Sequence, residues 1–144
     1  MVNNATALSR EQMVELAKKY FRLVDGEEGS LIDMFTTDCR VFFPKYGTAR
    51  GPQELAELAS GLLKTQKFFR HDFDSMVFTV EGDRLAVEGL VAGESADGRS
   101  WPAHPRNEGR YCNVFEFSGG LISRLHIYED PDFLTEDTAR LLWD

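Results

Sequence analysis

The segment from Tyr111 to Tyr128 constrains the fold more than any other part of the chain. Tyr111 to Phe117 alternates aromatic and polar residues among strong β-formers, and Leu121 to Tyr128 alternates again. The intervening Ser118-Gly119-Gly120 tolerates positive φ angles, which tight turns require. The segment therefore predicts a β-hairpin.

The first strand of this hairpin places one amide among aromatic rings. Side chains alternate across a strand, so three aromatic residues share a face with Asn113. They are Tyr111, Phe115 and Phe117. An amide on an apolar face needs a hydrogen-bond partner, which either the protein or a ligand can provide. Asn113 is therefore a candidate for ligand contact.

Helical patterns dominate the N-terminal half of the chain. Ser9 and Gln12 form a capping box ahead of apolar residues at helical spacing, which predicts a helix from about Ser9 to Val24. A short second helix is predicted from Leu31 to Phe35. Gly51-Pro52 begins a third helix whose apolar stripe occupies one side only. Such a stripe indicates that this helix lies on a sheet.

Strand patterns follow these helices. The predicted strands are Arg40 to Phe43, His71 to Val80, Leu85 to Glu94, Tyr111 to Phe117 and Leu121 to Tyr128. Ser100 to Glu108 contains two prolines, so it is an edge segment or a loop positioned to cover a pocket mouth. A short helix is predicted from Leu134 to Trp143. Helices followed by a meander indicate one α+β domain over residues 1–144, with its core at about residues 9–133.

Charge and cysteine content narrow the classes of function. The net charge is −8, with 24 acidic against 16 basic residues and no Lys/Arg cluster, which argues against nucleic acid or an anionic membrane as partner. Cys39 and Cys112 lie far apart and show no metal-binding spacing. The N-terminus lacks a signal-peptide pattern and no run of about 18 apolar residues occurs, so a cytoplasmic protein is expected.

The order of elements and three local phrases resemble the nuclear transport factor 2-like superfamily, in its SnoaL-like and ketosteroid isomerase-like branch. The phrases are YFRLVDG, FTTDCRVFFPKYGTARGP and GRYCNVFEFSGGLISRLHIYEDP. The resemblance covers roughly residues 9 to 133. It implies a curved antiparallel sheet that wraps three helices into a cone with an apolar pocket. Members include isomerases, dehydratases, polyketide cyclases and epoxide hydrolases, as well as binding proteins, so the fold alone does not fix the activity.

Residues carried over from this family match only in part. The carboxylate base of the steroid isomerases would stand at Phe43, so that base is absent. Asn113 stands where those enzymes place a protonated carboxylic acid, and Tyr20 matches their donor tyrosine. An amide can also donate to an oxyanion, although more weakly. Arg110 and Asp130 are possible remnants of the Asp-Arg-Asp set of the epoxide hydrolases.

The fold's dehydratases, such as scytalone dehydratase, offer the closer chemical resemblance. They combine tyrosines, a histidine at the head of the sheet and an asparagine on the strand of Asn113. Here Tyr20 and Tyr46 would provide the hydroxyl groups, and His71 is the histidine placed to serve a central cavity. An ordinary imidazole, with a pKa of about 6.5, can accept and return a proton near neutral pH.

Strand alternation assigns faces around this histidine. Phe73, Ser75 and Val77 are predicted on the face of His71 and Asp72 on the other, so a carboxylate partner must come from elsewhere. Asp38 and Asp130 are the two candidates for that partner. In the last strand, Leu125 and Ile127 are predicted to line the cone, which leaves His126 outside with Arg124 and Tyr128.

We therefore expect a cofactor-independent isomerase, dehydratase or cyclase that acts on a small apolar, oxygenated, polyketide-like or steroid-like molecule. The expected catalytic residues are His71, Tyr20 and Asn113. The expected substrate-binding residues are Phe43, Tyr46, Trp101, Arg110 and Phe115. No metal site or cofactor is expected, and the outer sheet face is expected to form a homodimer. The alternative is a non-catalytic domain that binds a small molecule or a protein partner.

Overall fold

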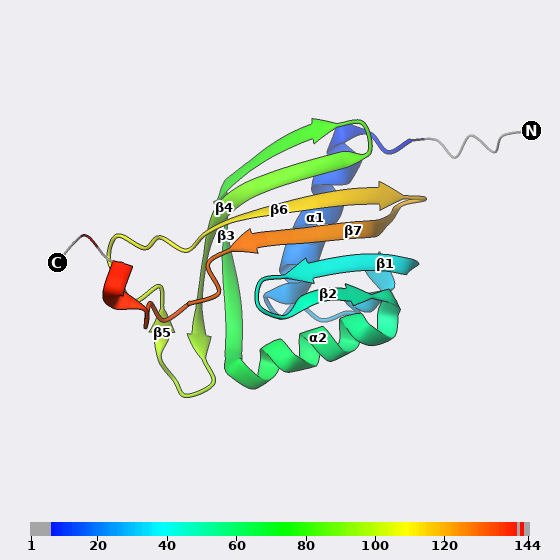
Figure 1. Cartoon of the computed structure of the whole chain (residues 1–144). Helices are drawn as coiled ribbons and strands as arrows, with labels where there is room; N and C mark the ends of the chain where they lie inside the picture. Colours follow the sequence, from blue (N-terminus) through cyan, green and yellow to red (C-terminus); the bar gives the residue numbers. More distant parts are fainter. Residues whose placement is uncertain (1–6, 141, 143–144) are drawn as a thin grey trace, which may run out of the picture.

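The computed structural model describes residues 7–140 and 142, and it confirms the predicted α+β architecture (Figure 1). Residues 1–6, 141 and 143–144 of the predicted domain lie outside the described part. Helix α1 (Arg10–Val24) begins at the predicted capping box. The Ser9 hydroxyl accepts from the Gln12 backbone N–H at 3.1 Å, and the Gln12 side chain accepts from the Ser9 N–H at 2.8 Å. These two bonds satisfy donors that a helix start otherwise leaves unpaired.

The predicted second helix, Leu31 to Phe35, is reduced to a single 3₁₀ turn, η1 (Ile32–Met34). Phe35 is already extended and begins strand β1 (Phe35–Phe43), which starts well before the predicted Arg40. The β-branched Thr36 and Thr37 favour this extended backbone. Strand β1 then turns into a short strand, β2 (Gly47–Arg50), which the sequence pattern did not predict.

The remaining strands are β3 (Gln66–Glu81), β4 (Arg84–Ser95), β5 (Ser100–Trp101), β6 (Arg110–Ser118) and β7 (Leu121–Glu129). One curved sheet contains every strand of the described residues, in the order β2-β1-β7-β6-β4-β3, with β5 paired to β4. The predicted hairpin is confirmed as β6 and β7, and Gly119 and Gly120 adopt the positive φ angles expected of its turn. The sheet is mixed, because β1 runs parallel to β7 while the other ladders are antiparallel.

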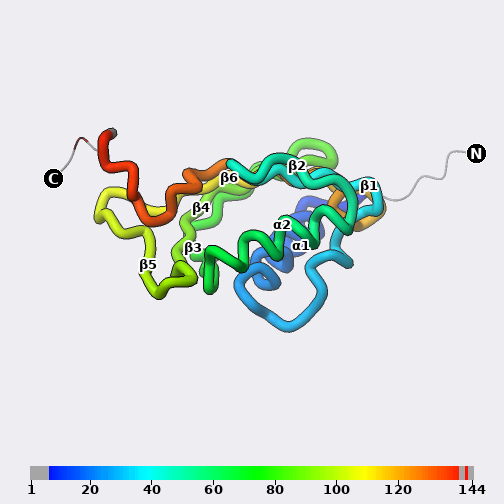
Figure 2. Tube along the Cα trace, turned by 60° about the horizontal axis from the view of Figure 1, so that its bottom comes forward, coloured from blue at the N-terminus to red at the C-terminus, as the bar shows by residue number. Residues whose placement is uncertain are grey.

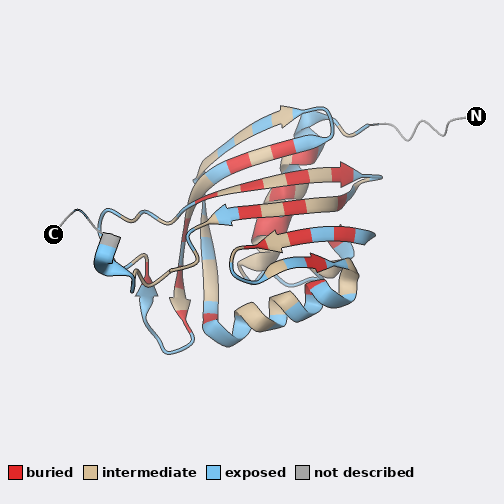
Figure 3. Cartoon of the chain, in the orientation of Figure 1, coloured by how far each residue is buried: buried red, intermediate tan, exposed pale blue. Residues whose placement is uncertain are grey.

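The two α-helices lie on the same, concave face of the sheet (Figures 1 and 2). Helix α2 (Gly51–Thr65) carries Pro52 in its first turn, as predicted. Buried residues alternate with more exposed ones along β4, β6 and β7, so these strands bury one face only (Figure 3). None of the helices in the described part combines the length and apolar character needed to cross a membrane.

Strand β3 differs from the prediction in the orientation of one side chain, that of Val77. Its register against β4 shifts between Asp72 and Val77, which marks a bulge. Beyond the bulge Met76 and Phe78 pack against the core, whereas Val77 is 57% exposed and does not share the inner face of His71. A bulge inserts one residue without a partner, so strict alternation fails beyond it.

The predicted C-terminal helix, Leu134 to Trp143, is absent from its described part except for one 3₁₀ turn, η2 (Thr138–Arg140). The Asp132 carboxylate accepts from the Glu136 and Asp137 backbone N–H groups, both at 2.9 Å. These bonds hold the chain in a turn ahead of η2. The rest of the predicted helix, residues 141 and 143, lies outside the described residues.

Trp101 anchors the predicted edge segment to the sheet. Strand β5 pairs with the end of β4, and the indole N–H of Trp101 donates to Gln66 Oε1 at 2.8 Å. The ring lies directly over Gly93, where an added Cβ would stand 2.3 Å from Trp101 Cζ2 and 2.5 Å from the Phe68 carbonyl oxygen. Gly93 therefore makes room for the indole ring.

Replacing Gly93 with alanine should lower the free energy of unfolding by about 1–3 kcal/mol, because the new methyl group overpacks this site. Urea denaturation measures the change. The control Ala92→Ser adds one atom at the preceding residue, which is exposed, and should change the stability by less than about 0.5 kcal/mol. An unchanged denaturation midpoint in Gly93→Ala would contradict the contact.

Candidate active site

A cavity of about 400 Å³ lies between the two helices and the concave face of the sheet. Its walls are mostly apolar, and its volume falls in the range of small-molecule sites. The apolar side chains include Leu23, Val24, Leu31, Phe35, Val41, Phe43, Leu55, Leu58, Leu62, Phe69 and Ile127. The polar side chains that line it are Tyr20, His71, Tyr111, Asn113 and Glu129. The described lining contains no Lys or Arg.

His71 forms a buried dyad with a carboxylate that the sequence reasoning missed. His71 Nδ1 lies 2.6 Å from Asp25 Oδ1, and the His71 backbone N–H donates to Asp25 Oδ2 at 2.8 Å. The two side chains are only 9% and 16% exposed. A carboxylate at Nδ1 holds the ring proton there, so Nε2 remains as the proton acceptor. The arrangement is that of an oriented general base.

The predicted partners of His71 were wrong. Asp38 and Asp130 are exposed, and Asp25 at the end of α1 takes their place across 46 residues of sequence. Asp25 follows Phe21 by four residues, so it continues the buried stripe of α1. A carboxylate in line with a buried apolar stripe was the available signal, although Asp25 resembled an ordinary helix-ending residue.

Asn113 and Tyr111 present polar atoms that the described part of the chain leaves without hydrogen-bond partners. These atoms are Asn113 Oδ1 and the Tyr111 hydroxyl oxygen, and both are buried. The Tyr111 hydroxyl lies across β4, where a Cβ added to Gly89 would stand 2.8 Å from it. Buried polar atoms without partners are costly, so this pair is suited to receive a polar group of a ligand.

Tyr20 and Tyr111 remain phenols under ordinary conditions. Burial raises the pKa of each hydroxyl well above its usual value, and nearby carboxylates add to the effect. Glu129 and Asp25 are the carboxylates that act on both. A protonated phenol can donate a hydrogen bond to a carbonyl or hydroxyl oxygen. The cavity therefore offers donors for a neutral oxygenated molecule.

Glu129 is the second residue that the sequence reasoning missed. It ends β7, lines the cavity and stands directly across from Tyr111 in the β6–β7 ladder. Burial, and secondarily the neighbouring Asp130 carboxylate, raises the pKa of Glu129 to about 7. The alternation of Leu125 and Ile127 points Glu129 inward as well, but the predicted strand stopped at Tyr128.

The residues predicted for the site from the sequence divide into two groups. His71, Tyr20, Asn113 and Phe43 line the same cavity, and Phe115 packs its ring 5.4 Å from that of Tyr20. Tyr46 is 45% exposed and stacks edge-on against Phe43 from outside the lining. Trp101 is buried against Phe133, and Arg110 is exposed and bonded to Glu108. These three residues do not line the cavity.

The outer face of β7 carries His126, as the alternation predicted. His126 Nδ1 lies 3.0 Å from the Arg124 guanidinium and 3.2 Å from the Tyr128 hydroxyl. Burial, and secondarily the charge of Arg124, lowers the pKa of His126. In the described residues no group of three or more His, Cys, Asp or Glu side chains is arranged to hold a metal ion.

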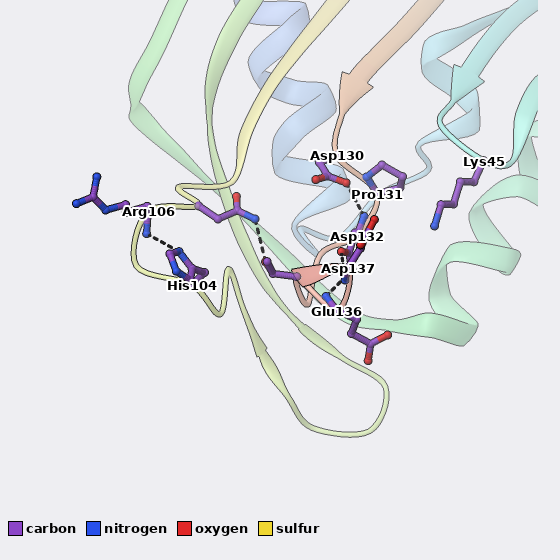
Figure 4. A pocket seen from close by; sticks show the side chains of 10 residues that line it. Lys45, His104, Arg106, Asp130, Pro131, Asp132, Glu136 and Asp137 are labelled. Carbon is purple, nitrogen blue, oxygen red and sulfur yellow. Dashed lines mark hydrogen bonds between the residues drawn. The ribbon is translucent and has the colours of Figure 1, made fainter. Parts of the chain in front are cut away.

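A wider, more polar hollow of about 630 Å³ opens near the C-terminal turn (Figure 4). Its walls include Lys45, His104, Asp130 and Asp132. Asp132 already accepts backbone N–H groups of the turn, and His104 Nδ1 accepts from the Arg106 backbone N–H at 3.1 Å (Figure 4). This hollow is bounded by bonds that shape the loops, so the apolar cavity is the stronger candidate.

Comparison with known proteins agrees with this architecture. The model of the SnoaL-like domain family matches residues 17–125, and the chain belongs to this family. The resemblance to the nuclear transport factor 2-like superfamily is thereby confirmed. No curated protein matches the chain.

Several solved structures share the fold at low sequence identity. An NTF2-like protein from Anabaena variabilis is 16% identical, covers 89% of this chain and 96% of its own, and has a TM-score of 0.68. A proposed polyketide cyclase from Sinorhizobium meliloti is 18% identical over 79% of this chain and 94% of its own, with a TM-score of 0.61. TerC, co-crystallised with polyporic acid, is 15% identical over 83% and 92%, with a TM-score of 0.65.

The raised pKa of Glu129 predicts how stability depends on pH. The folded chain holds this proton more tightly than the unfolded chain, whose carboxyl has the ordinary pKa of 4.5. Its contribution to stability is therefore lost as the pH rises from about 4.5 to about 7. Glu129→Gln should be more stable than the wild type at pH 8 by about 1–3 kcal/mol, with little difference at pH 5.

Urea denaturation at the two pH values tests this expectation. Glu88→Gln is the matched control, because Glu88 is exposed on the other face of the sheet. The control should leave the pH dependence of the wild type unchanged. Equal stability of Glu129→Gln and wild type at pH 8 would show that the carboxyl is not held in an unfavourable site.

Proposed function

We propose that this chain is a cofactor-independent lyase or isomerase that removes a proton next to a carbonyl group, with elimination of water as its main reaction. The His71–Asp25 dyad at the wall of an apolar cavity is the observation that carries the proposal. The substrate is a small, neutral, oxygenated ring compound of the polyketide or steroid kind. A described lining without Lys or Arg gives no counter-charge to an anionic substrate.

The proposed base is His71 Nε2, which takes the proton from the carbon. Asp25 stabilises the imidazolium that forms, because its carboxylate stays bonded to Nδ1. The Tyr20 and Tyr111 hydroxyl groups are available to donate to the substrate carbonyl oxygen, where negative charge develops, and Asn113 Oδ1 is available to accept from a substrate hydroxyl group. Returning the proton to another carbon gives isomerisation, whereas loss of a hydroxyl group gives dehydration.

Two relatives of the fold are compatible with such a substrate. The Sinorhizobium meliloti protein is described as a proposed polyketide cyclase, and the TerC structure was solved with polyporic acid. Cyclisation also begins with loss of a proton next to a carbonyl group, so the same dyad would serve it. By the family resemblance, Phe43 stands where the steroid isomerases place their base. We assign the task of the base to His71 instead, which lies on β3, several strands away from β1 in the sheet.

The test uses 3-hydroxy-1-tetralone, a bicyclic β-hydroxy ketone whose loss of water gives fluorescent 1-naphthol. His71→Ala should lower kcat/KM by about 10²-fold or more, because the base is lost. Asp25→Asn should lower it by on the order of 10²-fold as well, because the amide no longer stabilises the imidazolium. Both variants should keep the wild-type circular dichroism spectrum.

His104→Ala is the matched control, since His104 lies in the loop after β5 and outside the cavity. It should retain the wild-type rate. If His71→Ala retains the rate too, His71 is not the base. If the wild type binds 1-naphthol without turning over the ketone, the cavity belongs to a binding protein, which is the alternative function.

We also propose that two copies of the chain pair through the outer sheet face. Phe42, His126 and Tyr128 form an aromatic cluster there, with the Phe42 ring 5.7 Å from His126 and 6.3 Å from Tyr128. Tyr128→Ala should convert a dimer into a monomer in sedimentation velocity, because it removes an aromatic ring from the centre of this contact. Leu121→Glu, at the hairpin tip, should remain dimeric. A monomeric wild type would contradict the proposal.

A further inference from the structure

Glu129 is a carboxyl group in the cavity that the His71–Asp25 dyad does not use. It lies at the end of β7, opposite Tyr111 in the neighbouring strand β6. It lines the same cavity as His71 and Asn113. Within the described residues it takes part in neither a salt bridge nor a side-chain hydrogen bond. A carboxyl group in this position is therefore available to a ligand.

The sheet order places Glu129 and His71 on opposite sides of Tyr111. Strands β7, β6, β4 and β3 are consecutive neighbours, with Glu129 on β7 and His71 on β3. Three strand spacings separate the two backbones by about 14 Å along the sheet. Tyr111 extends over Gly89 toward β3, and its ring centre lies 5.1 Å from that of His71. The two groups therefore approach the cavity from opposite sides.

The charges around Glu129 explain why it can hold a proton. Tyr20 faces it from α1 and Tyr111 from β6, and both are neutral phenols. Asp130 follows it in the chain and is negative, which opposes ionisation. The Arg110 guanidinium, although on the neighbouring strand, is exposed and bonded to Glu108.

Among the described residues that line the cavity, none supplies a compensating Lys or Arg charge. Helix α2 contributes only apolar side chains to the cavity, and the Asp25 and His71 side chains at its far wall bind each other. Burial and Asp130 keep the pKa of Glu129 at about 7, so both the acid and its carboxylate are populated near neutral pH. A group poised in this way can give up a proton and regain it within a catalytic cycle.

We propose that Glu129 is the catalytic acid that protonates the departing hydroxyl group of the substrate while the His71–Asp25 dyad removes the proton from carbon. This inference rests on the proposed elimination reaction. Two groups with separate tasks, a base and an acid, would then share the cavity, each fixed by its own strand. The substrate class that fits them is a neutral β-hydroxy ketone, in which the acidic C–H and the leaving oxygen are on adjacent carbons.

The step balances without any further reagent. The C–H bond breaks, its proton goes to His71 Nε2, and its electron pair forms the new C=C bond. The C–O bond breaks on the adjacent carbon, and the leaving oxygen takes the Glu129 proton and departs as water. The imidazolium and the Glu129 carboxylate that remain exchange one proton through solvent, which restores the starting state.

The leaving group provides the decisive experiment. Hydroxide needs a proton to depart, whereas acetate leaves readily without one. We compare 3-hydroxy-1-tetralone with 3-acetoxy-1-tetralone, which both give 1-naphthol. Glu129→Gln should lower kcat for the hydroxy ketone by about 10²-fold or more and lower kcat for the acetoxy ketone by less than about 5-fold. His71→Ala should lose both activities, and Glu88→Gln should keep both.

The pH profile gives a second, independent measurement. For the hydroxy ketone, the wild-type rate should fall as the pH rises above about 7, because Glu129 loses the proton it must donate. The acetoxy ketone should not show this fall. In infrared difference spectra of the wild type, a carboxylic acid C=O band should disappear over the same pH range, and Glu129→Gln should lack that band.

The outcomes separate the two proposals. If the wild type turns over both ketones and Glu129→Gln does too, with an unchanged pH profile, Glu129 is not the acid and the proposed function stands. If Glu129→Gln lowers kcat equally for both ketones, Glu129 has a structural role and is not the catalytic acid. If the wild type turns over neither ketone, the elimination reaction fails, and the role of Glu129 fails with it.

Discussion

The contact between Asp25 and His71 is the interaction on which the site depends. It joins the C-terminal end of α1 to the long strand β3 through two bonds, one to the imidazole ring and one to the strand backbone. Because both side chains are largely shielded from water, breaking either bond would leave a polar group without its solvent. The same contact thus fixes the helix against the sheet and orients the base.

The aromatic residues around this contact keep its geometry. The Phe21 ring centre lies 4.6 Å from that of His71, and Tyr111 stands edge-on to the same imidazole. Phe21 is fully buried, so it cannot yield to a rotating imidazole without opening the core. The base is positioned by packing on two sides and by a carboxylate on the third, which is the rigidity that proton transfer needs.

Much of the fold follows from local pattern, whereas the pairing of distant groups does not. The capping box at Ser9 and the alternation around Asn113 are short-range signals, and the structure contains both α1 and the β6–β7 hairpin. Contact between Asp25 and His71 depends on how α1 crosses β3, which no local pattern encodes. The parallel β1–β7 ladder is of the same kind, because its strands come from opposite ends of the chain.

The prediction of side-chain orientation along β3 was wrong and Glu129 was missed, for different physical reasons. A bulge after Asp72 changes which side chains point inward, and a regular period cannot anticipate it. Glu129 obeys the period of Leu125 and Ile127, but a carboxylate after Tyr128 resembles a polar strand end. Its burial becomes evident only when the fold places it in the wall of the cavity, near Tyr20 of α1 and Tyr111 of β6.

Helix α2 has a consequence for how molecules reach the site. Leu55 is the buried residue of this helix, whereas Leu63, which lines the same cavity as Leu58 and Leu62, is 67% exposed. Apolar surface of the cavity wall thus stands in contact with water, and a ligand that covers it gains about 25 cal/mol per Å² of apolar surface buried. An apolar ring compound therefore associates with this surface more readily than a hydrated ion does. This preference selects among ligands before any hydrogen bond forms in the cavity.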